Sequence, residues 1–281
     1  MQDVKKLMDK QDVRMLLLYL LKQVNMICEN NNIPYYASAG TCLGAVRHNG
    51  LIPWDDDIDI MIPRNYYDKF VKCCENNLKS PVMIRTREND SNFCCEYIKL
   101  CYKDDLLGYS DLSIDVFFLD ETEPKRKIFR AIQNRILQDL YFVKKYKVSK
   151  AKSGDFYVPH NIFKRIYVSL LGVLLSIKKI DQIVNKVMLA EKRDCEYWIN
   201  WGSCYSYKKA TYLKKSFGVP QKVQYENTYI YIPEKPDVML SQLYGQDYMT
   251  PPPPEKCTDH GVRILNCNEL EIEMIRKEIE I

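Results

Sequence analysis

Four carboxylates stand within five residues of this chain, at positions 55–59, and lead directly into an apolar strand; residues 53–62 read PWDDDIDIMI. Side chains alternate along a strand, so Asp57 and Asp59 are expected on one face, about 7 Å apart at the backbone. Two such carboxylates repel each other in a core, but they suit Mg²⁺, which prefers oxygen ligands. We therefore expect a cation site with Asp57 and Asp59 as ligands. For Asp55 and Asp56 an acidic surface turn stays an equal alternative.

The composition favours a folded chain with a sizeable core. The 281 residues are 46% hydrophobic and 28% charged, which predicts one domain or a domain with a helical annex. The net charge of +4 comes from scattered basic residues and gives little support to a nucleic-acid partner, so none is expected. The 11 cysteines and the polar first residues favour a reducing cytoplasm. A zinc site among the cysteines is less favoured than buried packing, because no Cys-x-x-Cys spacing occurs.

One segment suggests contact with a membrane. Residues 166–180 read IYVSLLGVLLSIKKI, an apolar run that is shorter than the ~18 residues of a spanning helix. Its basic flanks, Lys164, Arg165, Lys178 and Lys179, suit a helix that lies on an anionic membrane surface. We therefore predict peripheral contact at the inner face of the membrane through residues 164–180. A buried core helix is the alternative.

The first half of the chain alternates helices and strands. Apolar residues at helical spacing predict a helix over the first thirty residues, and a short strand is expected at 35–37. Residues 38–48, SAGTCLGAVRH, contain small residues that let a helix start tightly against the strand end, where free N–H groups attract an anion. The acidic strand then runs to Ile62, and a helix is expected from Pro63 to Leu78.

The second half of the chain is expected to contain further strands followed by a mainly helical region. Strands are expected at 82–87, 94–101 and 112–119, helices over most of 124–193 with a polar stretch at 149–160, a strand pair within 221–232 and a helix at 237–244. Asp115 stands alone between apolar neighbours in an internal strand, where carboxylates rarely lie unpaired. It is expected to be a third metal ligand or a general base, with a salt bridge to a lysine or arginine as the alternative.

Together, these parts of the chain predict a single site that binds phosphates. The turn at Gly40 and Thr41 would hold a phosphate through backbone amides and the Thr41 hydroxyl. Asp57 and Asp59 would hold one or two Mg²⁺, about 3.5 to 4 Å apart when two are present, and Asp115 would complete the cluster.

The arrangement resembles the nucleotidyltransferase fold of the DNA polymerase β type, an α+β mixed-sheet core, here with a helical annex. Residues 40–60, GTCLGAVRHNGLIPWDDDIDI, closely resemble the signature of the LicD/fukutin family. Residues 114–120 and 217–249, followed by Pro251, Pro252 and His260, resemble the family too, whereas about 124–210 match nothing recognisable. This predicts a catalytic core at 1–123, a mainly helical annex at 124–210 that contacts a membrane or the acceptor, and a segment at 211–281 that completes the core.

The resemblance implies a reaction. A phospho-alcohol, phosphocholine first and ribitol or glycerol phosphate as alternatives, would pass from a CDP-activated donor to a sugar hydroxyl of a cell-surface glycan or its lipid-linked precursor, with release of CMP. Mg²⁺ is the expected cofactor and Mn²⁺ the alternative. One rival is a nucleotidyltransferase that moves NMP onto a small molecule or sugar. Another is an inactive glycan- or nucleotide-binding subunit, which has no reason to keep three mutually repelling acids.

The resemblance also implies roles for single residues. The catalytic and metal-binding residues would be Asp57, Asp59 and Asp115. The donor and its phosphates would be bound by Gly40, Thr41, Arg47, His48, Trp54, Lys99 and His260. Alternatives stay open for four of these: a structural salt bridge for Arg47, packing at the helix end for His48, cover of the sheet edge for Trp54, and a solvated strand lysine for Lys99.

Overall fold

The structure is a computed structural model that describes residues 6–7, 10–90, 92–104, 108–124, 127–151, 162–191, 193–257, 264–265, 273 and 275–277. The chain forms two compact units. The first unit comprises Met1–Arg85, Tyr97–Phe118 and Lys215–Ile281, and the second comprises Thr86–Glu96 and Leu119–Lys214. The second unit thus includes a short segment from the first hundred residues, which the predicted division at 123 and 210 does not contain.

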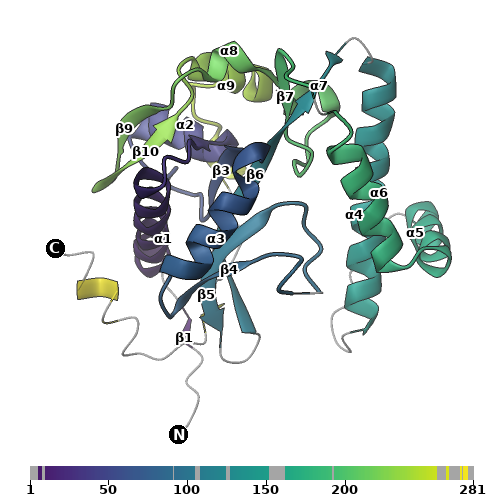
Figure 1. The fold of residues 1–281 in the computed structure, drawn as a ribbon. Coiled ribbons are helices and arrows are strands. Elements are labelled where there is room, and N and C mark those ends of the chain that lie inside the picture. The colour runs from purple at the N-terminus through teal and green to yellow at the C-terminus, as the bar shows by residue number, and fades with distance from the viewer. Residues whose placement is uncertain are drawn as a thin grey trace, which may run out of the picture. The chain divides into compact units, whose positions relative to one another are not determined.

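The first unit is built on a sheet (Figure 1). Its strands lie in the order β2 (Tyr36–Ala37), β3 (Ile58–Pro63), β6 (Gly108–Thr122), β5 (Ile98–Asp104) and β4 (Val82–Arg85). The pairs β2–β3, β4–β5 and β5–β6 are antiparallel. A hairpin of β9 (Gln221–Tyr225) and β10 (Thr228–Ile232) lies beside helix α1 (Lys10–Asn30). The combination of a sheet with helices is that expected for an α+β chain.

Helix α1 covers the core of this unit with the apolar residues that predicted it. Leu16, Leu17, Leu20 and Leu21 are fully buried. The Tyr102 hydroxyl on β5 donates a hydrogen bond to the Leu16 carbonyl (2.8 Å), so the helix is tied to the sheet. The other helices of this unit are α2 (Ala39–His48), α3 (Tyr67–Asn77) and α9 (Pro236–Tyr244). Shorter elements of the chain are β1 (Lys6–Leu7), η1 (Arg64–Tyr66), α8 (Lys214–Phe217), η3 (Pro254–Lys256) and β11 (Ile264–Leu265).

Several predicted boundaries between residues 63 and 122 are wrong. Pro63 does not begin a helix: its extended backbone (φ −58°, ψ 136°) ends β3, and η1 precedes α3. β5 begins at Ile98 and not at residue 94, because the preceding segment is held elsewhere by an ion pair of Arg87 with Glu96 (2.7 Å). β6 is longer than predicted and runs from Gly108 to Thr122.

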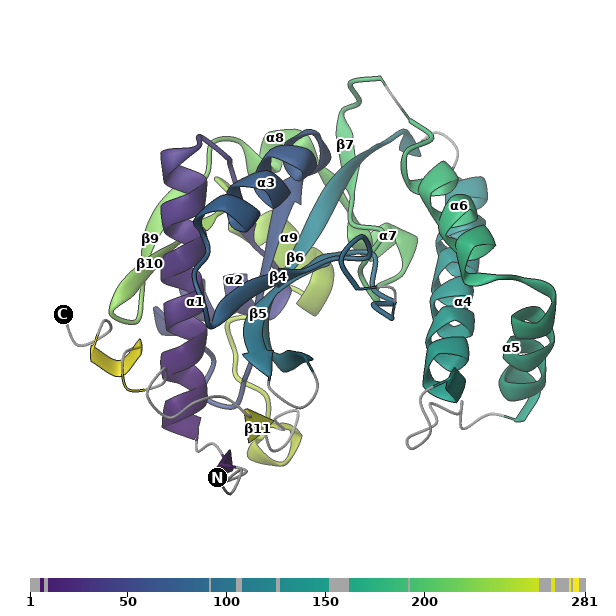
Figure 2. The same cartoon turned by 60° about the horizontal axis from the view of Figure 1, so that its bottom comes forward.

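The second unit is mainly helical. Helices α4 (Lys127–Ala151), α5 (Ile162–Leu174) and α6 (Ile177–Met188) lie side by side (Figure 2). The region predicted as a helical annex also contains β7 (Tyr197–Ile199), which pairs with residues 120–122 of β6, and it is followed by β8 (Thr211–Leu213), which pairs with β7. A short helix, α7 (Tyr207–Ala210), precedes β8. The hydrophobic core of this second unit includes Leu140, Val143, Val168, Ile180, Val184 and Trp201.

The segment predicted as one amphipathic helix at 166–180 is two helices. α5 ends at Leu174, and the Ser176 hydroxyl caps α6 by accepting a hydrogen bond from the Lys179 backbone N–H (3.2 Å). Serine favours an N-cap over a helix interior, which explains the break. No helix in the described part of the chain combines the length and the apolar character that crossing a bilayer requires.

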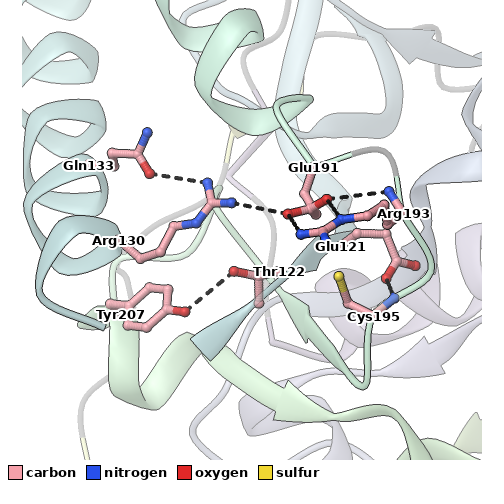
Figure 3. Close-up of polar contacts among 8 residues, drawn as sticks. All are labelled: Glu121, Thr122, Arg130, Gln133, Glu191, Arg193, Cys195 and Tyr207. Atoms are coloured by element: carbon pink, nitrogen blue, oxygen red, sulfur yellow. Dashed lines mark hydrogen bonds and ion pairs between the residues drawn. The ribbon is translucent and has the colours of Figure 1, made fainter. Parts of the chain in front are cut away.

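Polar contacts in the second unit hold the segment between α6 and β7 (Figure 3). Buried Arg130 contacts Gln133 (3.1 Å) and Glu191 (3.8 Å), and Glu191 also accepts two hydrogen bonds from the Arg193 guanidinium. Glu121 accepts hydrogen bonds from the backbone N–H of Cys195 (2.9 Å) and from the Trp198 ring. These bonds connect α4 and β6 to the residues that precede and begin β7.

Candidate functional site

The acidic run alternates as predicted. Asp56, Ile58 and Ile60 are buried, whereas Asp57 and Asp59 are half-buried, so the latter two lie on the same side of the strand. Burial, and then the negative charges of Asp57, Asp115 and Asp55, raise the pKa of the Asp59 carboxyl well above its usual range, and Lys99 opposes this rise. The acids therefore gather around Asp59, and their mutual repulsion is only partly compensated.

Asp115 lies on β6, the neighbour of β3 in the sheet, and forms the salt bridge that was its alternative interpretation. The Lys99 ammonium on β5 lies 2.8 Å from Asp115 Oδ1 and 2.9 Å from the Ser113 hydroxyl, which itself donates to Asp115 Oδ1 (2.9 Å). Lys99 and Asp115 are directly opposite each other in the antiparallel pair. Lys99 is only 18% exposed, so it is a paired lysine at the site and not a solvated one.

The turn before α2 lies against this cluster. The Thr41 hydroxyl accepts a hydrogen bond from the Asp59 backbone N–H (2.8 Å), and the Ser38 N–H bonds the Asp59 carbonyl (2.9 Å), so the start of α2 is fixed to β3. A Cβ on Gly40 would lie 3.0 Å from Asp55 Oδ2, which puts a carboxylate at the positive end of the helix dipole. Ala39 has a positive φ of 39°, an uncommon value for a residue other than glycine.

Asp55 and Tyr225 belong to the site although the sequence did not single them out as ligands. Asp55 acts electrostatically on Asp59 and contacts the position of Gly40. Tyr225, the last residue of β9, is fully buried, and its hydroxyl has no hydrogen-bond partner within the described part of the chain. Burial, and then the charge of Asp55, raise the pKa of Tyr225 well above its usual range. A buried polar atom without a partner beside an acidic cluster suggests a place for a bound group. The spacing of more than 160 residues hid Tyr225 from sequence analysis.

Arg47, His48 and Trp54 form a second group at the other end of α2. Arg47 donates to the Tyr248 carbonyl (2.9 Å) and to His48 Nε2 (2.9 Å), and its guanidinium lies 6.0 Å from the Trp54 ring centre. His48 and Trp54 contact edge to face. Burial, and then the charges of Arg47 and Arg14, lower the pKa of His48, so its ring is neutral near pH 7. Along the helix axis, Arg47 lies roughly 10 Å from Gly40.

The loop after α2 is held by long-range contacts. Arg14 forms an ion pair with Glu226, and Glu226 Oε1 accepts a hydrogen bond from the Leu51 N–H (3.0 Å). Gly44 allows the loop to approach the helix, since a Cβ there would lie 2.4 Å from the Gly50 carbonyl oxygen. These contacts therefore fix the position of the loop from which the acidic strand begins.

The acids around Asp59 offer the oxygen ligands that a hard cation prefers. Within the described ranges no three His, Cys, Asp or Glu side chains are grouped as a metal site. Asp115 Oδ1 is already engaged by the Lys99 ammonium and by the Ser113 hydroxyl. The raised pKa of Asp59 indicates that a cation would relieve repulsion there.

The fold and the site together define a class, an α/β domain in which carboxylates of two neighbouring strands gather at the start of a helix. Comparison with known proteins identifies it further. Residues 32–99 match the family model described as LicD/FKTN/FKRP, nucleotidyltransferase domain, a range that contains every predicted site residue except Asp115 and His260. The resemblance to the LicD/fukutin family that residues 40–60 predicted is thus supported by the family model and by a relative that is similar along most of the chain.

The relatives differ in how much of the chain they cover. The chain is 25% identical over 260 residues to the lipopolysaccharide cholinephosphotransferase LicD of Haemophilus influenzae, covering 90% of this chain and 96% of that protein. It is 52% identical over 46 residues to uncharacterised proteins of Rickettsia prowazekii and Rickettsia typhi, which is 16% of this chain and 17% and 15% of theirs. The similarity to the Haemophilus protein therefore includes both units.

The structure thus brings Gly40, Thr41, Asp57, Asp59, Lys99 and Asp115 together, and it adds Asp55, Ser113 and Tyr225. Arg47, His48 and Trp54 form their own group. His260 lies outside the described residues.

Proposed function

We propose that this protein transfers phosphocholine from CDP-choline to a sugar hydroxyl of a cell-surface glycan or its lipid-linked precursor and releases CMP. The observation that carries the proposal is the similarity to a lipopolysaccharide cholinephosphotransferase along nearly the whole length of both chains. The gathering of acids around Asp59 supports it, because the donor is a pyrophosphate that needs its charge neutralised. Ribitol and glycerol phosphate are the alternative phospho-alcohols.

Asp57, Asp59 and Asp115 would hold Mg²⁺, with Mn²⁺ as the alternative. When bound there, the ion would neutralise the pyrophosphate and orient it for an in-line displacement. For Asp115 to take part, its pair with Lys99 must open, and the released ammonium would then lie where a donor phosphate binds. The Tyr225 hydroxyl, which is buried beside Asp55, would offer the donor a hydrogen bond.

The transfer itself is a displacement at phosphorus on a fold of the nucleotidyltransferase type. The sugar oxygen would attack the phosphorus that carries choline, a new phosphorus–oxygen bond would form, and the bond to the bridging oxygen would break, so that CMP leaves with that oxygen. If Asp115 acts as the general base instead of as a metal ligand, it would accept the proton of the sugar hydroxyl. Gly40 and Thr41 would position the donor at the start of α2, provided that Asp55 turns away from Gly40.

The proposal predicts CMP release from CDP-choline with Mg²⁺ and a glycan acceptor. CDP-ribitol and CDP-glycerol would be assayed in parallel, with CMP measured by chromatography. Asp115→Asn should lower turnover by about a thousandfold. Asp111→Asn is the matched control, an exposed acid on the same strand, and it should leave turnover unchanged. Transfer of NMP to the acceptor, or equal activity of the two variants, would contradict the proposal.

A further inference from the structure

Helix α5 exposes a continuous row of large apolar side chains. Each is between 46% and 84% exposed, and the row comprises Ile162, Phe163, Ile166, Tyr167, Leu170, Val173 and Leu174. This spacing puts them on one side of the helix, which we call the apolar face of α5. A buried core helix was the alternative interpretation of the segment, and for α5 it is wrong.

The opposite side anchors α5 to its unit. Val168 is fully buried in the core shared with α4 and α6, and Leu171 packs against the same core. The Lys147 ammonium on α4 donates a hydrogen bond to the Gly172 carbonyl. The apolar face is therefore displayed by a fixed helix, and folded proteins rarely leave such a patch uncovered without a partner.

The charged residues of the sequence segment that carries this face are all positive. Residues 161–180 contain no Asp or Glu and four cations, Lys164, Arg165, Lys178 and Lys179. Lys178 and Lys179 are exposed at the start of α6. The next acid in the chain, Asp181, is already paired with Lys144 (2.7 Å) and with Arg87 (3.4 Å). The surroundings of the apolar face thus suit an anionic partner.

We propose that the apolar face of α5 inserts into the headgroup region of an anionic lipid bilayer, with Lys178 and Lys179 at the lipid phosphates. Apolar side chains that include Phe163 and Tyr167, flanked by cations, are the chemistry of a helix that lies in a membrane interface. A second copy of the chain is a poorer occupant, because a two-fold axis through this face would bring its own cations together. The binding is independent of the proposed transfer.

The experiment is co-sedimentation of the full-length protein with lipid vesicles and without donor or acceptor. Vesicles that contain phosphatidylglycerol should bind the protein about tenfold more strongly than vesicles of phosphatidylcholine alone, and added salt should weaken this binding. Ile166→Asp and Val173→Asp should each lower the partition by about tenfold or more, and so should the double change Lys178→Glu with Lys179→Glu. All four residues are exposed, so the fold should persist, which melting curves would check.

Ile128→Asp is the matched control, because Ile128 is an 81% exposed isoleucine on α4 and not on α5. It should bind vesicles as the unchanged protein does. The proposal is overturned if the unchanged protein ignores anionic vesicles, if Ile166→Asp binds them equally well, or if only Ile128→Asp loses binding. It is also overturned if the protein is a dimer that Val173→Asp dissociates and that does not bind vesicles. Since no donor is present, these outcomes do not bear on the transfer reaction.

Discussion

Asp59 is the residue on which the proposed chemistry depends most. Its carboxyl lies among three other acids that raise its pKa, so the ionised form is disfavoured without a cation. Asp59→Asn removes one of the repelling charges and keeps the size of the side chain. We therefore expect this variant to melt at a higher temperature than the unchanged protein when metal is absent.

The same change should abolish stabilisation by Mg²⁺. A cation that binds only the folded state raises the melting temperature, and the amide is a much poorer ligand. Thermal melts of both proteins with EDTA and with excess Mg²⁺ give the four values needed. An equal Mg²⁺-dependent rise in both proteins would contradict the assignment of Asp59 as a ligand.

Replacement of Lys99 is expected to have the opposite effect on stability. Its ammonium is mostly buried and offsets the charge of Asp115, so Lys99→Met leaves the acids without this compensation. The free energy of unfolding should fall by about 1–3 kcal/mol without metal, and Mg²⁺ should restore part of the loss. Urea denaturation with and without Mg²⁺ measures both effects. A variant as stable as the unchanged protein under both conditions would show that the pair does not compensate the cluster.

At the scale of elements, the position of α2 is set by its glycines. A Cβ on Gly44 would lie 2.4 Å from the Gly50 carbonyl oxygen, so Gly44→Ala must push helix and loop apart. We expect a loss of about 2 kcal/mol or more, although alanine favours a helix by about 1 kcal/mol.

Gly172 in α5 is the matched position for this comparison. A Cβ there would lie 3.7 Å from the side chains of Lys147 and Tyr146, an ordinary contact, so Gly172→Ala should be neutral or stabilising. Denaturant titration of the two variants measures the difference. Equal effects on the free energy of unfolding would mean that the loop after α2 yields easily and does not fix the acidic strand.

The elements differ in how well the sequence predicted them. The helix α1 and the alternation of Asp57 and Asp59 followed from local periodicity, and both are found. Pro63 was assigned to a helix because proline favours a first turn, but its φ also suits the end of a strand. The strand β7 was missed because its three residues pair with β6, a partner from a distant part of the sequence.

At the scale of the whole molecule, the two units could be predicted only in part. A helical region after the first strands was foreseen, but the inclusion of residues 86–96 depends on Arg87, which bonds Asn185 (2.8 Å) and pairs with Asp181 on α6. Such long-range polar contacts leave no local pattern. Tyr225 and the pair of Lys99 with Asp115 belong to the site for the same reason, since folding, and not spacing, brings them to the acids.

The reaction itself is tested most directly by following both halves of the donor. CDP-choline with an isotopic label in the choline would be incubated with the protein, Mg²⁺ and a glycan acceptor, and the products identified by mass spectrometry. The proposed function predicts that the acceptor gains a labelled phosphocholine group while one CMP appears for each transfer. An acceptor that gains unlabelled CMP, with labelled phosphocholine set free, would contradict it.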